Sequence, residues 1–444
     1  MSKYVKLPEL CGKSPWFELS RYREHKFGRV EDLRPDYDFV IVGAGFGGVF
    51  AAFRLTENNP SASVLLVDAN QIGTGSSGRN AGFVQIAQIA CAIVGNQKFT
   101  LRDQQWLVRM NTDVVTKIGA LREEHKLEFE WRRDGMYKAV REQRNQKHLD
   151  ELAGYFDELG IGYERVDGPE LCARLGTEFY KKSLFSADNY LHNPSETIRG
   201  LATALPENVL VLENSPVLEV KDGAVPSVVL ANGREIKAGR IILTVNAYLK
   251  DFYPREAANV TAIHSFGALT RPLAGSELDS FKNVQPWGIT GTHPAACTVR
   301  YTPDHRLFVR TDIAYAKNLN INPERMHKAV RLLKRAYDKR FPSVRHVEFE
   351  YIYGGLISFT GNTMPFFGEV ARNVVAGVSG EGSGVTRASI LGHYLADLLQ
   401  GVDSDALAYI KTAYRPNYLP PDPFRTVGAR GAILLKNIGA GTEL

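Results

Sequence analysis

The segment from Tyr37 to Phe83 constrains the fold more than any other stretch of this 444-residue chain. A β-branched apolar run leads into Gly43, Gly45 and Gly48, which have the spacing G-x-G-x-x-G. An apolar helix pattern follows, and then a second apolar run that ends in Asp68. In a strand–turn–helix unit such glycines let a diphosphate approach the backbone, and the helix N-terminus offers its N–H groups to the phosphates. Asp68 lies 20 residues after Gly48, where its carboxylate can accept hydrogen bonds from a ribose diol. This favours an unphosphorylated ribose and so predicts NAD or FAD rather than NADP.

A second match to the same spacing, at Gly73, Gly75 and Gly78, lacks this context. No helix-like apolar repeat follows it, and it closes no strand–turn–helix unit. We interpret residues 73–78 as a glycine-rich loop and not as a second dinucleotide fold.

The composition is that of an ordinary globular chain of two or three domains. Hydrophobic residues make up 44%, charged residues 23%, and the net charge is only +5 without a long basic block, so no nucleic-acid partner is expected. The four cysteines are scattered without metal-ligand spacing, which predicts no metal site and a reducing, cytoplasmic location. No signal peptide is evident, and the longest apolar stretch, residues 81–95, is too short to span a bilayer.

Hydrophobic periodicity predicts a chain that leaves the nucleotide-binding unit and returns to it twice. The expected helices cover residues 85–93, 101–121, 143–159, 169–175, 323–340 and 385–400. The expected strands cover 127–140, three short runs and a final buried one between 208 and 245, and then 262–273, 297–310, 347–359 and 373–378. A glycine-rich turn at 380–384 links the last strand to the last helix, and the tail from 415 is Pro-rich with an apolar patch at 432–435.

Three motifs resemble one family, the FAD-dependent amine and amino-acid oxidoreductases that include D-amino-acid oxidase, glycine oxidase and sarcosine oxidase. Within it they are most similar to the gamma-glutamylputrescine oxidoreductase branch. The motifs are the fingerprint at 43–48, the run GSSGRNAG at 75–82, and a C-terminal set from 353–355 to 380–385. The segment 300–307 is similar to the branch's substrate-domain hairpin. Ala81, Tyr353 and Asn362 replace the branch's usual Gly, Trp and Asp, which leaves the substrate open.

The resemblance implies an α/β fold in which a Rossmann-like FAD-binding domain of the glutathione-reductase type is interleaved with an α+β substrate domain on a mixed or antiparallel sheet. The expected boundaries are a leader at 1–36, the FAD-binding domain at 37–83, 195–250 and 355–415, the substrate domain at 84–194 and 251–354, and a tail at 416–444.

The resemblance also implies non-covalent FAD. The fingerprint glycines would hold the diphosphate, Asp68 the adenosine ribose, the Val217 backbone the adenine, and residues 380–386 the flavin ring. The implied cofactor-binding residues are Gly43, Gly45, Phe46, Gly48, Asp68, Ala69, Ser76, Ser77, Arg79, Asn80, Ala81, Val217, Asn246, Gly354, Gly380, Gly382, Gly384, Val385 and Thr386.

The expected chemistry is oxidation of the C–N bond of a small amine or amino acid, by hydride transfer to flavin N5 and hydrolysis of the resulting imine. The neutral amine's lone pair assists, so no protein base is obligatory. An amino-acid carboxylate would need an arginine in the pocket, because the guanidinium pairs with it bidentately. The pocket candidates are Arg300, Tyr301, Arg310 and Tyr353, with Arg387 and His264 as further ones; each also has an ordinary structural interpretation.

Other flavoprotein classes remain as alternatives. One is an FAD flavoprotein subunit of an electron-transfer complex without stand-alone amine oxidase activity. Another is an FAD hydroxylase, although residues 377–381 do not match the G-D-A-x-H pattern of that class. A disulfide reductase would need a redox C-x-x-C, which the sequence lacks. The electron acceptor, oxygen or an unknown carrier, stays open.

Overall fold

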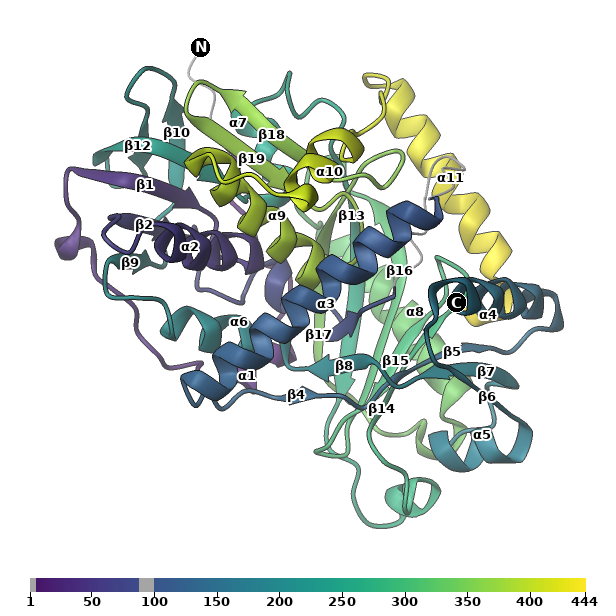
Figure 1. Ribbon diagram of the computed structural model, residues 1–444. Helices are drawn as coiled ribbons and strands as arrows, with labels where there is room; N and C mark the ends of the chain where they lie inside the picture. Colours follow the sequence, from purple (N-terminus) through teal and green to yellow (C-terminus); the bar gives the residue numbers. More distant parts are fainter. Residues whose placement is uncertain (1–4, 88–99) are drawn as a thin grey trace.

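The computed structural model describes residues 5–87 and 100–444, which form two eight-stranded sheets, a three-stranded sheet and the helices around them (Figure 1). The first sheet contains β1 (Asp36–Val42), β2 (Val64–Val67), β9 (Val209–Leu212), β10 (Val217–Lys221), β11 (Ser227–Leu230), β12 (Glu235–Leu243), β18 (Phe366–Ala371) and β19 (Val374–Val378). The second contains β5 (Met136–Val140), β6 (Glu164–Asp167), β7 (Lys182–Ser186), β13 (Thr261–Thr270), β14 (Trp287–Gly291), β15 (Thr298–Tyr301), β16 (Leu307–Tyr315) and β17 (Phe349–Phe359). The third contains β3 (Phe83–Gln85), β4 (Trp131–Arg132) and β8 (Asn189–His192).

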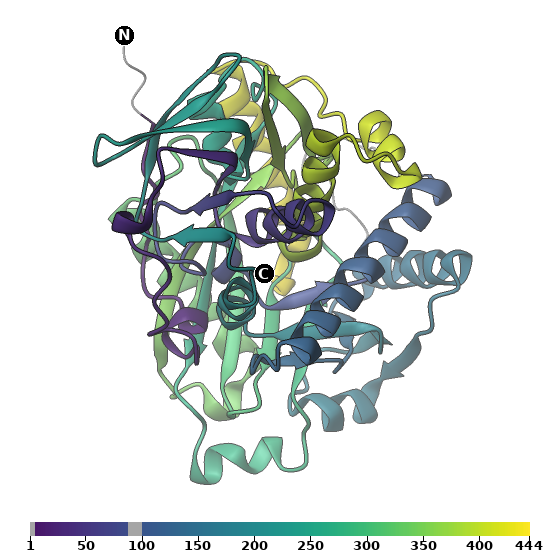
Figure 2. The ribbon, with the colours of Figure 1, turned by 60° about the vertical axis from the view of Figure 1, so that its left-hand side comes forward.

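The helices of the described residues lie on the faces and edges of these sheets (Figures 1 and 2). They are α1 (Pro15–Glu18), α2 (Phe46–Asn58), α3 (Leu101–Glu124), α4 (Gln146–Leu159), α5 (Gly168–Leu175), α6 (Pro194–Thr203), α7 (Leu249–Phe252), α8 (Pro323–Arg340), α9 (Gly384–Gln400), α10 (Asp405–Ala413) and α11 (Phe424–Ala440). Helix α3 packs against α9 and α4. No helix within the ranges 5–87 and 100–444 is long and apolar enough to cross a membrane.

The centre of the first sheet is parallel. Strands β9, β2, β1, β12 and β19 lie in that order and run in the same direction. Successive side chains of β1 alternate between the two faces, since Phe39 and Ile41 join one core cluster while Val40 and Val42 join another. Both faces are covered, which explains the continuous apolar run that predicted a buried parallel strand.

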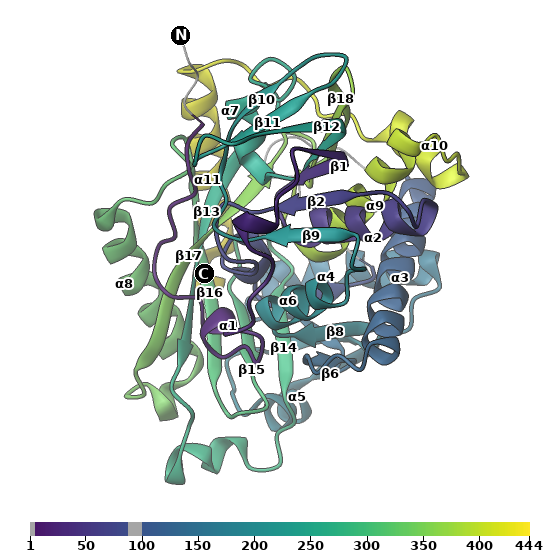
Figure 3. The same cartoon turned by 90° about the vertical axis from the view of Figure 1, so that its left-hand side faces the viewer.

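Helices α2 and α9 cover one face of this sheet and lie against each other (Figure 3). Their contact is made by backbone, because a Cβ added at Gly392 of α9 would lie 1.9 Å from the carbonyl oxygen of Gly47 in α2. Helix α2 follows β1 and α9 follows β19, so both helices begin at the carboxyl edge of the parallel sheet. In open α/β sheets that edge is where ligands bind.

The second sheet has the order β17-β13-β16-β15-β14-β5-β7-β6. Its pairs are antiparallel except for β14 with β5, so the predicted mixed sheet is present. Helix α8, which occupies the predicted range 323–340, packs on β13 and β16. The strands of the first sheet come from residues 36–67, 209–243 and 366–378; the finer domain boundaries stay a prediction.

Several sequence-based assignments need correction. The strand expected over 127–140 is two strands, because Gly135 between them has a φ of +70°. The strand pattern over 297–310 is a hairpin of β15 and β16, in agreement with the hairpin that the resemblance implied at 300–307. The helix expected over 85–93 is wrong at its start, where Gln85 ends β3, and residues 88–93 lie outside the described ranges. No helix was predicted in the Pro-rich tail, which contains α11, and this helix packs on β16.

Candidate active site

A cavity of about 360 Å³ is lined by residues of both large sheets and by the first turns of α2 and α9. One side is formed by the turn between β1 and α2. Gly43 in this turn has a φ of +100°, and a Cβ there would lie 2.7 Å from the carbonyl oxygen of Thr244. A Cβ at Gly48 would lie 1.9 Å from the carbonyl oxygen of Gly43. Only glycine fits at either position, so the turn brings bare backbone to the cavity.

The first turn of α2 presents backbone N–H groups as hydrogen-bond donors beside the cavity. Its leading N–H groups have no partner within the helix, and its N-cap, Gly45, has no side chain to accept from them. The Phe46 N–H donates to Ser77 Oγ at 3.3 Å. Nearby, the Asp68 carboxylate accepts from the N–H groups of Ala44 at 2.8 Å and Asn70 at 2.9 Å. Burial raises the pKa of Asp68 to about 6.

The loop from Ser76 to Ala81 forms the next part of the wall. Asn246 Nδ2 donates to Ser76 Oγ at 2.8 Å, and that hydroxyl donates to the carbonyl oxygen of Leu356 on β17, also at 2.8 Å. The Arg79 guanidinium donates to backbone carbonyls of residues 11, 12, 74 and 354 at 2.7–2.9 Å. Arg79 therefore ties the N-terminal leader and β17 to this loop.

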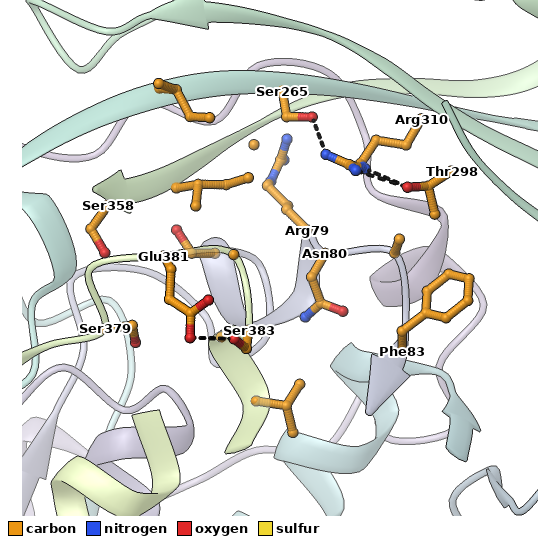
Figure 4. Close-up of a pocket in the computed structure, with 18 of the residues that line it drawn as sticks. Arg79, Asn80, Phe83, Ser265, Thr298, Arg310, Ser358, Ser379, Glu381 and Ser383 are labelled. Carbon is orange, nitrogen blue, oxygen red and sulfur yellow. Dashed lines mark hydrogen bonds between the residues drawn. The ribbon is translucent and has the colours of Figure 1, made fainter. Parts of the chain in front are cut away.

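The loop before α9 forms the opposite side of the cavity, where Gly382, Gly384, Val385 and Thr386 line it. The N-cap residue of α9, Ser383, makes no side-chain cap, so the first N–H groups of the helix keep their donors. Figure 4 shows the Ser383 hydroxyl donating instead to the Glu381 carboxylate, at 2.5 Å.

Arg387 fixes this loop. Its guanidinium donates to the Glu381 carboxylate at 2.9 and 3.1 Å and to the Tyr414 hydroxyl at 2.8 Å. Burial opposes the charge of Arg387, but Tyr414 and Glu381 more than offset it and its pKa is raised. Arg387 therefore neutralises Glu381 and is not directed at a substrate.

Arg310 on β16 brings a positive charge to the cavity wall formed by the second sheet (Figure 4). Its Nη2 and Nε donate to Thr298 Oγ1 at 2.8 and 3.3 Å, and its Nη1 donates to Ser265 Oγ at 3.1 Å. Strand register explains the arrangement, because Arg310 lies opposite Thr298 on β15 and opposite Gly267 on β13. No carboxylate of the described residues pairs with Arg310. Burial lowers its pKa, yet a guanidinium stays charged in proteins.

The neighbouring candidate Arg300 does not line the cavity. It is buried, donates to the carbonyl oxygens of Ala81 at 3.1 Å and His192 at 2.9 Å, and lies 5.0 Å from the Trp16 ring. These bonds are all made by Nη1, so Arg300 holds the loop after Arg79 in place through one end of its guanidinium. Glu130 lies 3.7 Å away and supplies a partial counter-charge.

The two tyrosine candidates have different positions. Tyr301 is buried away from the cavity, with its hydroxyl 2.6 Å from His305 Nδ1. Tyr353 lines the cavity, and its hydroxyl accepts from Trp16 Nε1 at 3.1 Å and donates to the carbonyl oxygen of Asn80 at 3.2 Å. Burial raises the pKa of Tyr353 to about 12, so it is neutral. The further candidate His264 is buried, with Nε2 2.8 Å from a backbone carbonyl.

Most of the implied cofactor residues lie in or beside the cavity wall. Those that line it are Gly45, Phe46, Ser76, Ser77, Arg79, Asn80, Ala81, Asn246, Gly382, Gly384, Val385 and Thr386. Gly43, Asp68, Ala69 and Gly380 belong to the turns beside it, and Gly48 to the first turn of α2, without lining it. Val217 begins β10, and Gly354 on β17 accepts from Arg79 through its carbonyl. Their contacts with a cofactor stay predictions.

Sequence reasoning missed several polar residues of the cavity. Gln85 and Thr292 line it with buried side-chain oxygens, Oε1 and Oγ1, that accept no hydrogen bond from the described residues. Lys138 and His293 line it as well. Gln85 carried a weak signal as a polar residue within the apolar stretch 81–95, whereas Thr292 lies in a turn after β14 that no motif distinguishes.

The charge of the lining favours an anionic ligand. Among described residues its charged groups are Arg79, Lys138, Arg310 and Glu381, and Glu381 is neutralised by Arg387. The first turns of two helices add their positive ends. A glycine turn with close backbone approach, a carboxylate after the second strand and a second helix N-terminus together fit FAD.

Comparison with known proteins agrees with this geometry. Residues 38–398 match the DAO family, described as FAD dependent oxidoreductase. A curated relative, the probable oxidoreductase OrdL of Haemophilus influenzae, is 25% identical over 409 residues, which is 88% of this chain and 89% of the relative. Gamma-glutamylputrescine oxidoreductase of Escherichia coli is 24% identical over 412 residues, 90% of this chain and 93% of that protein.

Solved structures show the same fold. Glycine oxidase from Geobacillus kaustophilus has a TM-score of 0.72 at 14% identity and matches 87% of this chain and 100% of its own. L-Amino acid deaminase from Proteus myxofaciens, in complex with anthranilate, has a TM-score of 0.68 at 13% identity, over 91% of this chain and 97% of its own. The predicted α/β fold class is confirmed.

Proposed function

The chain belongs to the DAO family of FAD-dependent oxidoreductases, and from that premise we propose that it oxidises the C–N bond of a small amine or amino acid, with an amino acid favoured. Bound FAD supplies the acceptor for a hydride from the carbon that bears the nitrogen. The product is an imine, which water hydrolyses.

The observation that carries this proposal is the Arg310 guanidinium in the cavity. Thr298 and Ser265 hold it with hydroxyl groups and leave its charge uncompensated by any carboxylate of the described residues. A guanidinium placed in this way suits a carboxylate, because two parallel N–H···O bonds fix both position and orientation. We therefore assign Arg310 to the α-carboxylate of the substrate.

The surrounding residues would keep the amine reactive. The cavity wall near Arg310 includes the apolar side chains of Ile263, Ile313 and Phe359, which exclude water. A nearby positive charge and low polarity both lower the pKa of a substrate ammonium. The substrate then favours its neutral amine form over the ammonium form without a dedicated protein base. The lone pair of the neutral amine assists departure of the hydride.

For the cofactor, we propose that the turn of Gly43, Gly45 and Gly48 binds the diphosphate, that Asp68 accepts from the adenosine ribose, and that the loop 380–386 contacts the flavin ring. A helix N-terminus at the ring favours the negative charge of the reduced state. The electron acceptor, oxygen or a carrier, and a cytoplasmic location remain predictions.

The test is anaerobic reduction of the flavin in the purified holoenzyme. Amino acids of both configurations and N-methyl amino acids are compared with the amines that lack only the carboxylate, such as glycine with methylamine and glutamate with 4-aminobutyrate. The visible flavin band should bleach at least about 100-fold faster with the amino acid of the best pair. Failure of every compound to bleach the flavin would refute C–N oxidation, and equal rates within each pair would refute the preference for amino acids.

A further inference from the structure

The outer face of α11 is an exposed apolar stripe. Its members are Phe424, Val427, Leu434, Leu435 and Ile438, with exposed fractions of 70, 69, 60, 70 and 65%. At 3.6 residues per turn, they fall within an arc of about 100° on one side of the helix. A contiguous exposed apolar surface, especially one rimmed by polar residues, is typical of a site that contacts a protein or a membrane.

The helix is held firmly by its opposite face, so the stripe is a fixed feature of the surface. Ile433 and Ala440 are buried in a cluster with Ile263, Ile313 and Phe359, three residues that line the cavity. Beyond the helix, the Glu443 carboxylate accepts from the N–H groups of residues 141 and 142. Figure 1 shows α11 at the periphery of the molecule, beside β16.

The charges on α11 identify the partner. The helix carries Arg425, Arg430 and Lys436 and no Asp or Glu. In projection these residues lie on both sides of the apolar stripe. Arg425 donates to the backbone carbonyls of Leu419 and Pro420 and interacts with Asp422, which also lies 3.9 Å from Lys317. Glu142 is paired with Arg144. The face is therefore apolar at its centre and positively charged at its margins.

We propose that α11 attaches the enzyme to the surface of an anionic lipid bilayer, with the stripe inserted among the upper acyl chains and the basic residues at the headgroups. An apolar stripe with Phe and Leu between Lys and Arg is the pattern of helices that lie in a membrane interface. A second copy of the chain fits less well, because an isologous contact would bring the three cations of one helix against those of the other.

The test measures binding of the full-length holoenzyme to vesicles by flotation. Vesicles of phosphatidylcholine alone are compared with vesicles that also contain phosphatidylglycerol, at low and high salt. The wild type should bind the anionic vesicles and lose affinity as salt rises. Leu434→Glu/Leu435→Glu should need at least about tenfold more lipid for half-binding, and Arg430→Gln about fivefold more.

Val225→Glu is the matched control, since Val225 is exposed to 64% on the hairpin of β10 and β11, away from α11. It should bind as the wild type does, and all variants should keep the visible flavin spectrum. Wild-type protein that stays unbound with every vesicle, or binding that is unchanged in Leu434→Glu/Leu435→Glu, overturns the proposal. So does a wild-type dimer, seen by light scattering, that the same double variant converts to a monomer without any vesicle binding.

Discussion

Replacing Arg310 by Met is expected to lower kcat/KM for amino acids far more than for the matching amines. Three of the five N–H groups of this guanidinium donate to Ser265 and Thr298, which leaves two for a carboxylate. A hydrogen bond to a charged group contributes about 1.5–3 kcal/mol, so two contribute about 3–6 kcal/mol. At about 1.4 kcal/mol per factor of ten, the loss in kcat/KM is about 10²- to 10⁴-fold. Arg310→Lys keeps the charge without the planar fork and should lose about ten- to a hundredfold.

The assay is stopped-flow reduction of the flavin under anaerobic conditions, with the amino acid that reduces the wild type fastest and with the amine that lacks its carboxylate. Arg331→Lys, on the exposed side of α8, is the matched control and should reduce at the wild-type rate. An Arg310→Met enzyme that keeps its flavin and still reduces at the wild-type rate with the amino acid would refute the assignment. An equal loss with both substrates would contradict a specific role at the carboxylate.

Three further variants test the cofactor side. Gly392→Ala places a methyl 1.9 Å from the Gly47 carbonyl oxygen and should lower the free energy of unfolding by about 1–3 kcal/mol or more, as measured by thermal unfolding. The control is Gly428→Ala, where an added Cβ meets no atom within 4 Å, and this change should be neutral or stabilising. Burial raises the folded-state pKa of Asp68 to about 6, above about 3.9 in an unfolded chain, so this group's contribution to apoprotein stability is lost as pH rises from about 4 to about 6. The Tm of apo Asp68→Asn minus the Tm of the apo wild type should therefore increase as the pH rises over that interval. The variant should also bind FAD more weakly than the wild type. A Tm difference that does not change with pH would contradict the raised pKa of Asp68. Arg387→Leu leaves a buried carboxylate unpaired and should cost about 3–5 kcal/mol, measured as a lower Tm and as FAD released on gel filtration.

The sequence predicts the nucleotide-binding part well because local chemistry decides it. The turn at Gly43 requires a positive φ and bare backbone, and the apolar run before it has to be buried on both faces. Helices with strong amphipathic patterns and clear ends, such as those over 323–340 and 385–400, are found within a residue of the expected bounds.

The substrate side is less predictable, because long-range contacts decide it. Arg300 and Arg310 lie on paired strands and, by the register of that pair, on the same face of the sheet. Only their position along the strands separates them, since Arg300 reaches the backbone of the loop at Ala81 and Arg310 reaches the cavity. The local sequence pattern does not distinguish these two positions, because the tertiary structure decides which of them faces the cavity. Helix α11 was missed because prolines precede it and Gly428 and Gly431 interrupt its pattern.

The backbone contact between Gly47 and Gly392 has a consequence for engineering. It joins the two helices that begin at opposite sides of the cavity into one rigid unit. Even the smallest side chain at that crossing would force the helices apart and change the span that the cofactor has to bridge. A designer who wants the enzyme to accept a new substrate should leave this pair intact and diversify the strands around Arg310, where side chains rather than backbone form the wall.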